Sequence, residues 1–237
     1  MASTSILNKN LIARVKADYS HGVTTDDTRL SDRLVYSILL MCRNELLTQK
    51  SDKKQSLSNW NYQTLSGIEL EPVNPAKCLG ISIGCPILRS KEKLPTILSD
   101  KSGYIILIVS TIDGITVFSP INIRAVKFSS ARKYTGNARQ YFIQDGYLYV
   151  TGDTSLKVCS MTAVFADPLQ ADKFQNLCND CKDCIDCTSN LDKEFVMDPG
   201  MHKVLVTLAV EELFNRFRIQ PIDRRNDSRE ETSSQAT

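Results

Sequence analysis

The chain has 237 residues, of which 42% are hydrophobic, so it is long enough to bury the core of one ordinary domain or of one domain with helical arms. Its 29 basic and 27 acidic residues leave a formal net charge of only +2, which argues against a dedicated nucleic-acid binder with a broad basic surface. No charged leader followed by an apolar segment opens the sequence, and the longest strongly apolar run, Ile105 to Val109, is far too short to span a bilayer. We therefore expect a protein of a reducing compartment, whose eight cysteines are free thiols or metal ligands rather than disulfides.

Two helices are predicted near the start of the chain. Apolar residues recur at helical spacing over 5–19, which indicates a first, short helix. A longer helix is predicted over 29–54, where Ser31 or Asp32 offers a side-chain oxygen to the free amides of the first turn. The long helix is apolar on most of its circumference, so it must be covered on two sides, and we expect another copy or a partner protein to supply the second cover. Its candidate contact residues are Val35, Leu39, Leu40, Leu46 and Leu47.

The middle of the chain has the patterns of β-structure. From 62 to 98, short strand-like runs are broken by prolines, and no regular helix fits. Residues 103–166 are the clearest β region, with Asp113-Gly114 and Asp145-Gly146 as turns; the second pair is the better signal for a two-residue hairpin. A further strand ends at Asp167-Pro168. Four or five antiparallel strands are therefore expected between the flanking helices.

The C-terminal region repeats the helical pattern. Asp198 can cap a helix in which Pro199 takes the first position, and apolar residues follow at helical spacing. The candidate contact residues on this helix are Val206, Val210, Leu213 and Phe217. The last residues are polar and lack periodicity, so we expect an extended tail that becomes ordered only when a neighbour holds it.

These patterns predict an α+β fold: an antiparallel β domain flanked by N-terminal helices and a C-terminal helix, followed by an extended tail. The predicted parts are an N-terminal helical part (1–54), an antiparallel β domain (55–174), a Cys/Asp-rich loop (175–197), the C-terminal helix (198–219) and the tail (220–237).

One candidate metal site stands out. Cys178, Cys181, Cys184 and Cys187 are evenly separated by two residues, and thiolates so close together are able to hold zinc or an iron–sulfur cluster. However, zinc sites normally use two separated pairs, and the aspartates between these cysteines disfavour packing of four thiolates. We therefore favour a solvent-exposed acidic loop and predict no metal and no cofactor. Cys42, Cys78, Cys85 and Cys159 are predicted to be structural.

A basic run is the candidate nucleic-acid contact. It comprises Arg124, Lys127, Arg132, Lys133 and Arg139, with no acidic residue between them. Such a run is able to contact phosphates, including those of DNA that is bound without sequence readout. It is also compatible with an acidic neighbour in an assembly or with a solvated loop and strand face.

Signs of catalysis are missing from the sequence. The two histidines, His21 and His202, lie in no recognisable nucleophile motif, and there is no phosphate-binding loop or Gly-rich dinucleotide fingerprint. Glu211 and Glu212 are adjacent on a helix and so point in different directions. We predict that the protein is not an enzyme and has no catalytic residues.

Several stretches of the chain, in order, resemble structural virion proteins of crAss-like tailed phages. The resemblance covers roughly residues 29–230 and rests on the order of many short motifs. These are SDRLVYSILLMCRNELLTQKSDKK, NYQTLSGIELEPVNPAKC, CPILRSKEKLPTIL, YFIQDGYLYV, LKVCSMTAVFADP and EFVMDPGM. Such proteins are neck components, that is, rings or adaptors stacked beneath the portal of short-tailed phages.

The resemblance implies a homo-oligomeric ring of about twelve copies at the head–tail junction of the virion. The expected partners are the portal protein and adjacent neck-ring or tail proteins, with phage DNA in non-specific proximity and no membrane. The protein would be made in the cytoplasm of the bacterial host. Two other readings of the residues stay open: a small metalloprotein that uses Cys178 to Cys187, and a nucleic-acid-binding accessory protein that uses residues 124–139.

Overall fold

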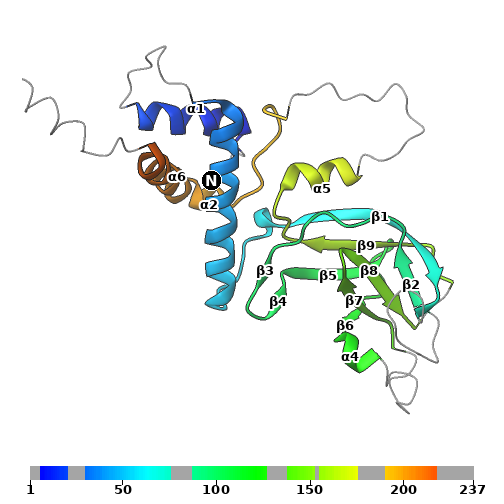
Figure 1. Ribbon diagram of the computed structural model, residues 1–237. Helices are drawn as coiled ribbons and strands as arrows, with labels where there is room; N and C mark the ends of the chain where they lie inside the picture. The colour runs from blue at the N-terminus through cyan, green and yellow to red at the C-terminus, as the bar shows by residue number, and fades with distance from the viewer. Residues whose placement is uncertain are drawn as a thin grey trace, which may run out of the picture.

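A computed structural model of the chain describes residues 6–20, 30–75, 87–126, 138–152, 155–175 and 190–217. It has a helical part and a curled, mostly antiparallel sheet, which lie side by side (Figure 1). The predicted α+β class, with helices before and after an antiparallel sheet, is confirmed.

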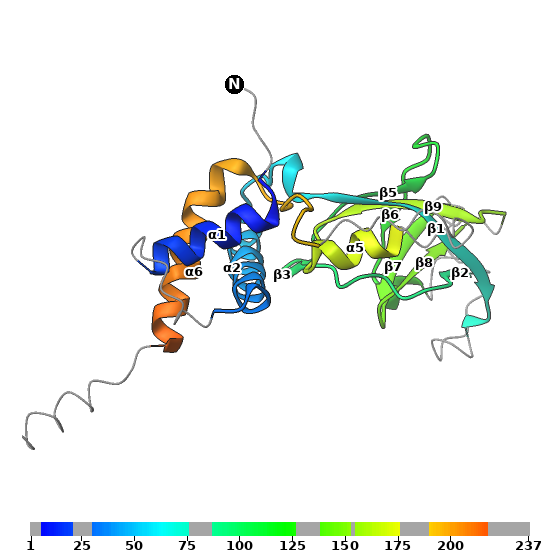
Figure 2. The same ribbon diagram turned by 90° about the horizontal axis from the view of Figure 1, so that it is seen from above.

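The helical part consists of α1 (Asn8–Tyr19), α2 (Asp32–Asp52) and α6 (His202–Phe217). The Ser31 side chain accepts a hydrogen bond from the Leu34 amide and so caps α2, as predicted. A 3₁₀ turn, η2 (Pro199–Met201), precedes α6, and the Asp198 carboxylate accepts from the Gly200 amide at its start. The three helices cross one another (Figure 2) and share one apolar core. Its fully buried members include Leu11, Val15, Val35, Ile38, Leu39, Leu205, Val206, Ala209 and Leu213.

The segment 190–197 binds the start of α1. This helix has no side-chain cap, and its first amides are instead satisfied by backbone carbonyls: Asn8 donates to Lys193 and Lys9 to Leu191, both at 2.9 Å. In the opposite direction, the Phe195 amide donates to the Ile6 carbonyl at 2.9 Å. The segment leading to α6 thus completes the beginning of α1, and the two ends of the fold depend on each other.

The main sheet has seven strands in the order β5-β9-β1-β2-β8-β7-β6, and all neighbours are antiparallel except β6 and β7. The strands are β1 (Gln63–Val73), β2 (Ile87–Ser90), β5 (Ile106–Thr111), β6 (Ser119–Pro120), β7 (Gln140–Gln144), β8 (Tyr147–Thr151) and β9 (Val158–Ala163). A separate small hairpin joins β3 (Ser99–Asp100) to β4 (Gly103–Tyr104). The short elements η1 (Asn59–Asn61), α4 (Ile123–Val126) and α5 (Pro168–Gln175) complete the described structure.

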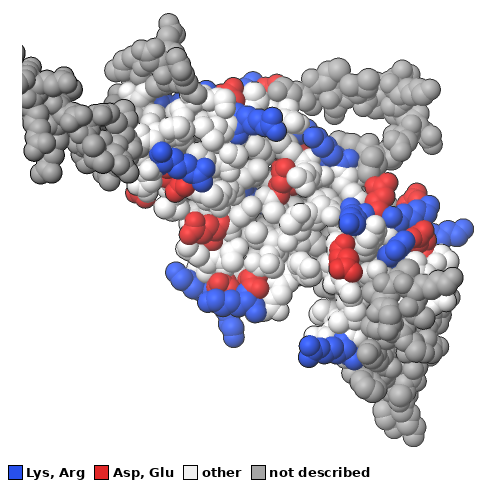
Figure 3. Space-filling model, in the orientation of Figure 1, with Lys and Arg blue, Asp and Glu red and all other residues white. Residues whose placement is uncertain are grey.

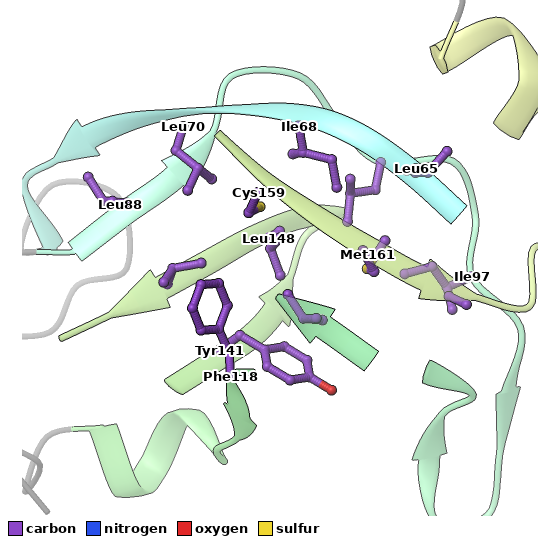
Figure 4. Packing of buried hydrophobic residues seen from close by; sticks show 14 of the residues in the cluster. Leu65, Ile68, Leu70, Leu88, Ile97, Phe118, Tyr141, Leu148, Cys159 and Met161 are labelled. Carbon is purple, nitrogen blue, oxygen red and sulfur yellow. The ribbon is translucent and has the colours of Figure 1, made fainter. Parts of the chain in front are cut away.

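The sheet curls until its two edges meet. The Phe118 amide donates to Val109 of β5 at 2.8 Å, while the next amide, that of Ser119, donates to Arg139 beside β7 at 3.1 Å. The residues that lead into β6 therefore bridge both edges. The curl encloses the second core, in which side chains from β1, β8 and β9 meet (Figure 4). Cys159 lies in this core and Cys42 in the helical core, which confirms the structural role predicted for both, whereas Cys78 and Cys85 lie outside the described residues.

The predicted Asp145-Gly146 hairpin is confirmed. It joins β7 to β8 with Gln144 paired to Tyr147, and both turn residues have positive φ, 53° and 81°, as a type I′ turn requires. The expectation that prolines break 62–98 into short runs is wrong for Pro72. This residue pairs with Leu88 near the end of β1, which runs for 11 residues and bulges at Gly67 (φ 85°).

Neither α4 nor α5 was predicted. At Asp167-Pro168, where a strand was predicted to end, α5 begins, and the Asp167 carboxylate accepts a hydrogen bond from the Leu169 amide at 3.0 Å. Asp167-Pro168 therefore starts a helix in the same way as Asp198-Pro199. The Gln63 side chain ties this helix to β1, because its amide nitrogen donates to the Pro168 carbonyl and to Asp172.

A buried arginine joins the helical part to the sheet. Arg43 of α2 has no accessible surface. Its Nε donates to the Val196 carbonyl at 2.7 Å, and its Nη1 donates to the Phe165 carbonyl at 2.9 Å and to the Asn44 side chain at 3.0 Å. Burial lowers the pKa of the guanidinium to about 10, so it stays charged at neutral pH. Arg43 thus holds α2, the chain after β9 and segment 190–197 together with charge-assisted hydrogen bonds.

An apolar contact and a polar tie reinforce this joint. Leu47 of α2 packs with Ile105 and Val164 of the sheet part, and all three are buried. Further along the helix, the Ser51 hydroxyl donates to the Asp100 carboxylate at 2.5 Å, and this bond is the main reason that the pKa of Asp100 lies below its usual value. The last two turns of α2 are therefore fixed to the sheet part.

Replacement of Arg43 by Met is expected to lower the free energy of unfolding by about 2–5 kcal/mol, because the buried Phe165 carbonyl and the partly buried Val196 carbonyl lose a charged donor. The measurement is urea unfolding followed by circular dichroism. The matched control is Arg33→Met, since Arg33 is exposed on the same helix and its loss is expected to change stability by less than about 0.5 kcal/mol. Equal losses in the two variants would show that Arg43 does not hold the joint.

His202 is expected to make stability depend on pH. It is 3% exposed, with its ring edge-on to Phe195, and burial lowers its pKa, so the folded state favours the neutral imidazole. In the unfolded chain a histidine takes up its proton near pH 6.5, so stability falls as the pH drops through that value, by at most about 1.4 kcal/mol per unit. The His202→Phe variant should lose this component between pH 7.5 and 5.5 in urea titrations. Parallel pH profiles for the two proteins would contradict it.

Candidate assembly interface

Five of the nine predicted contact residues are buried inside the chain. These are Val35, Leu39, Leu47, Val206 and Leu213, each at most 2% exposed. They pack in the helical core or, for Leu47, at the joint with the sheet. The second cover expected for α2 is therefore supplied by α1, α6 and the sheet of the same chain. A neighbouring chain does not reach these five side chains unless the helices separate.

The other four predicted contact residues keep some accessible surface. Leu40, Leu46 and Val210 are half-buried against the helical core, and Phe217, in the last turn of α6, is 47% exposed. Two further apolar side chains lie at the end of α6 and were not predicted as contacts. The Phe214 ring lies tilted against the ring of Tyr19, and the Met41 sulfur accepts from Arg216 at 3.5 Å. We call Met41, Phe214 and Phe217 the α6-end surface.

A second exposed apolar surface lies on the hairpin that joins β5 to β6. Its four large aliphatic side chains, Leu107, Ile112, Ile115 and Val117, are 57%, 61%, 81% and 55% exposed. We call residues 107–117 the β5–β6 hairpin. Its Asp113-Gly114 turn was predicted, but its exposure was not. The stretch is apolar on both faces, so its pattern does not show which face is covered.

The turn of the hairpin is held by its own hydrogen bonds. The Asp113 carboxylate accepts from the Thr111 hydroxyl and from the Ile115 amide, and both bonds hold its pKa below the usual value. The Gly114 amide donates to the Thr111 carbonyl at 2.9 Å, and Gly114 has φ 70°, a conformation that favours glycine. The exposed aliphatic side chains are therefore presented on an ordered turn.

The predicted basic run is divided by the structure. Lys127, Arg132 and Lys133 lie outside the described residues. Arg124 is exposed on α4, whereas Arg139 is half-buried and its Nη1 donates to the Thr116 hydroxyl at 2.9 Å. Arg139 thus braces the β5–β6 hairpin. Basic and acidic side chains are interspersed on the face that Figure 3 shows. Ion pairs of the described residues include Lys91–Glu69 and Lys16–Asp32.

Two features of the described residues bear on ligand binding and catalysis: one surface recess and two buried thiols. A recess of about 210 Å³ beside Trp60 and Phe195 is smaller than typical ligand pockets. Burial raises the pKa of the Cys42 thiol to about 11 and that of the Cys159 thiol to about 12, so both stay protonated at neutral pH and are poor nucleophiles or metal ligands.

The described ranges contain no group of three or more His, Cys, Asp and Glu side chains placed to hold a metal ion. The cysteine ladder Cys178 to Cys187 lies outside those ranges, so both the prediction that it binds no metal and the metalloprotein alternative stay untested. None of the helices within them has the length and apolarity needed to cross a membrane.

The chain matches the model of a phage protein family over almost its whole length. The family is described as phage tail ring protein 2, of the crAss group, and the match covers residues 10–232. A comparison with curated proteins gives no match. The match includes α2, α6, the whole sheet and all of α1 except its first two residues, and it confirms the resemblance drawn from the short motifs. The chain therefore belongs to the phage tail ring protein 2 family of crAss-like phages, whose role is structural.

Proposed function

We propose that this chain forms a closed ring of identical copies in the neck of a crAss-like short-tailed phage, where it joins the head to the tail. The portal protein and adjacent neck-ring or tail proteins are the proposed partners, and the ring would hold about twelve copies around a channel for DNA. The match to the phage tail ring family over residues 10–232 carries this proposal. The role is mechanical and needs no catalytic residue.

Exposed apolar surface supports assembly through the helical end of the chain. Phe214 is 36% and Phe217 47% exposed in a single helical turn, and Met41, which is 39% exposed, contacts Arg216 of the same turn. Burying a phenylalanine side chain against a neighbour stabilises the contact by up to about 1.5–3 kcal/mol. We therefore propose the α6-end surface as one of the two surfaces that each copy uses in the ring, in place of the buried residues of α2.

The charge distribution supports a channel that lets DNA pass. Each phosphate that a protein neutralises adds to affinity, so a strongly basic lumen would retain the DNA. The formal net charge is only +2, and several basic side chains are already paired with acidic ones. Arg124 and the rest of the basic run remain candidates for weak, sequence-independent contact with DNA or with an acidic neighbour.

The direct test of the proposed function is electron cryomicroscopy of purified virions together with the mass of the isolated neck. We expect a closed ring whose mass is about twelve times the 26.6 kDa of the chain. Metal analysis of the same sample tests the alternative that Cys178 to Cys187 bind zinc or an iron–sulfur cluster. Absence of the chain from virions would overturn the proposal.

Replacement of Phe217 by Asp is expected to weaken ring assembly at least about tenfold, because a charge replaces an apolar contact, while the monomer keeps its stability. The readout is the fraction of ring in electron micrographs and sedimentation profiles. Asn215→Asp is the matched control, since it places the same charge on another exposed position of the same helical turn. Leu39→Asp is a poor test, because Leu39 has no accessible surface and the change would unfold the helical core. Normal rings with Phe217→Asp would exclude this surface from the contact.

A further inference from the structure

Most of the large exposed apolar side chains of the described residues belong to two groups. Three surround the last turn of α6: Met41, Phe214 and Phe217. Four lie on the β5–β6 hairpin: Leu107, Ile112, Ile115 and Val117. Val204, at the other end of α6, Trp60 and Tyr104 belong to neither group. Both views show α6 on one side of α2 and the strands β5 and β6 on the other (Figures 1 and 2).

The β5–β6 hairpin is unable to turn back and cover its own apolar side chains. It is anchored at its base by the Ser110–Val117 bridge and by the hydrogen bond from the Phe118 amide to Val109 at 2.8 Å. Arg139 holds its Thr116 side chain from the direction of β7. Exposed aliphatic side chains on an ordered projection favour association, because little conformational entropy is lost when a partner covers them.

We propose that the β5–β6 hairpin of one copy packs on the α6-end surface of the next copy in the ring. This inference rests on the proposed function. A ring contact is heterologous, so each copy must present two different surfaces that fit each other, and these must lie at separate places on the chain. The hairpin and the α6-end surface are two such surfaces, both apolar, on opposite sides of α2.

The charge of the hairpin favours a second copy over DNA. Its only charged residue is Asp113, whose carboxylate is bound within the turn, and an acidic tip repels phosphate. A contact between identical copies must not bring like charges together. The aliphatic side chains of the β5–β6 hairpin, packed on the phenylalanine and methionine side chains of the α6-end surface, meet this requirement. A different tail protein as the occupant is an outcome that the experiment below distinguishes.

The test places the photo-reactive amino acid p-benzoylphenylalanine at position 115 of the full chain, which is supplied to infected host cells so that virions incorporate it. After irradiation we expect a cross-linked dimer of this chain, in which position 115 is joined to the tryptic peptide 34–43, 204–216 or 217–218 of the other copy. The same label at position 104, where Tyr104 is 50% exposed on β4, is the control and should not give this product.

Three results would overturn the proposal: a cross-link only to a different virion protein, a dimer joined through other peptides, or no product from virions that contain the labelled chain. In each of these cases the chain is still a virion component, so the proposed function survives. Absence of the chain from virions of the unlabelled phage would instead remove the proposed function.

A pair of substitutions at the same position gives an independent test. Ile115→Asp should lower ring assembly at least about tenfold, whereas Ile115→Leu should leave it unchanged, because only the first loses the apolar contact. Unfolding curves of the two isolated variants should coincide with that of the unchanged chain, because the side chain at position 115 is 81% exposed. Equal assembly of the two variants would also overturn the contact.

Discussion

The fold depends on a charged side chain without accessible surface. Arg43 belongs to α2, yet its hydrogen bonds end on the carbonyls of Phe165 and Val196, which belong to two other segments of the chain. Removal of a guanidinium from water is costly. The Arg43 guanidinium is tolerated here because carbonyl and amide oxygens replace part of its hydration. These bonds require α2, the chain after β9 and segment 190–197 to take one arrangement. Apolar contacts alone would fix this arrangement less strictly, because they have no preferred direction.

This joint explains why the exposed apolar surface is divided as it is. The helical part covers α2 with α1 and α6, and segment 190–197 closes the start of α1 through its carbonyls. The sheet curls to enclose its own core, with Leu47, Ile105 and Val164 filling the space next to the helices. The apolar side chains that remain exposed lie mainly at the end of α6 and on the β5–β6 hairpin. In the proposed ring, these are the positions that a neighbour covers.

The sequence predicted local structure better than it predicted which faces meet. The caps Ser31 and Asp198 and the Asp145-Gly146 turn act through backbone atoms a few residues away, so their residue types are sufficient evidence. The start of α5 carries the same Asp-Pro signal as η2, but it follows a strand directly and the helix has only eight residues, too few to show apolar periodicity.

Coverage of an apolar face is a different kind of information. The pattern of α2 shows that two of its sides need covering. The helices that cover it, α1 and α6, either lie far from it in sequence or have equally general apolar patterns. The sequence therefore did not show whether the cover comes from the same chain or from another copy. The β5–β6 hairpin is the opposite case. Its apolar residues read as core, yet the curl of the sheet turns Leu107 and Val117 outward while Phe118 points inward. Both outcomes are set by tertiary packing. The same is true of Arg139, which belongs to the predicted basic run but donates a hydrogen bond to Thr116.

In the proposed ring the joint at Arg43 acquires a mechanical role. The two contact surfaces of a copy lie on opposite sides of α2, so the rotation that relates one copy to the next is set by the angle between the helical part and the sheet. An error in this angle repeats at every contact, and a ring that misses closure grows into an open helix instead. Directional hydrogen bonds from one guanidinium to two segments fix such an angle better than an apolar interface of the same size. The buried charge, which is costly for the isolated chain, is therefore well placed to make the number of copies in the ring uniform.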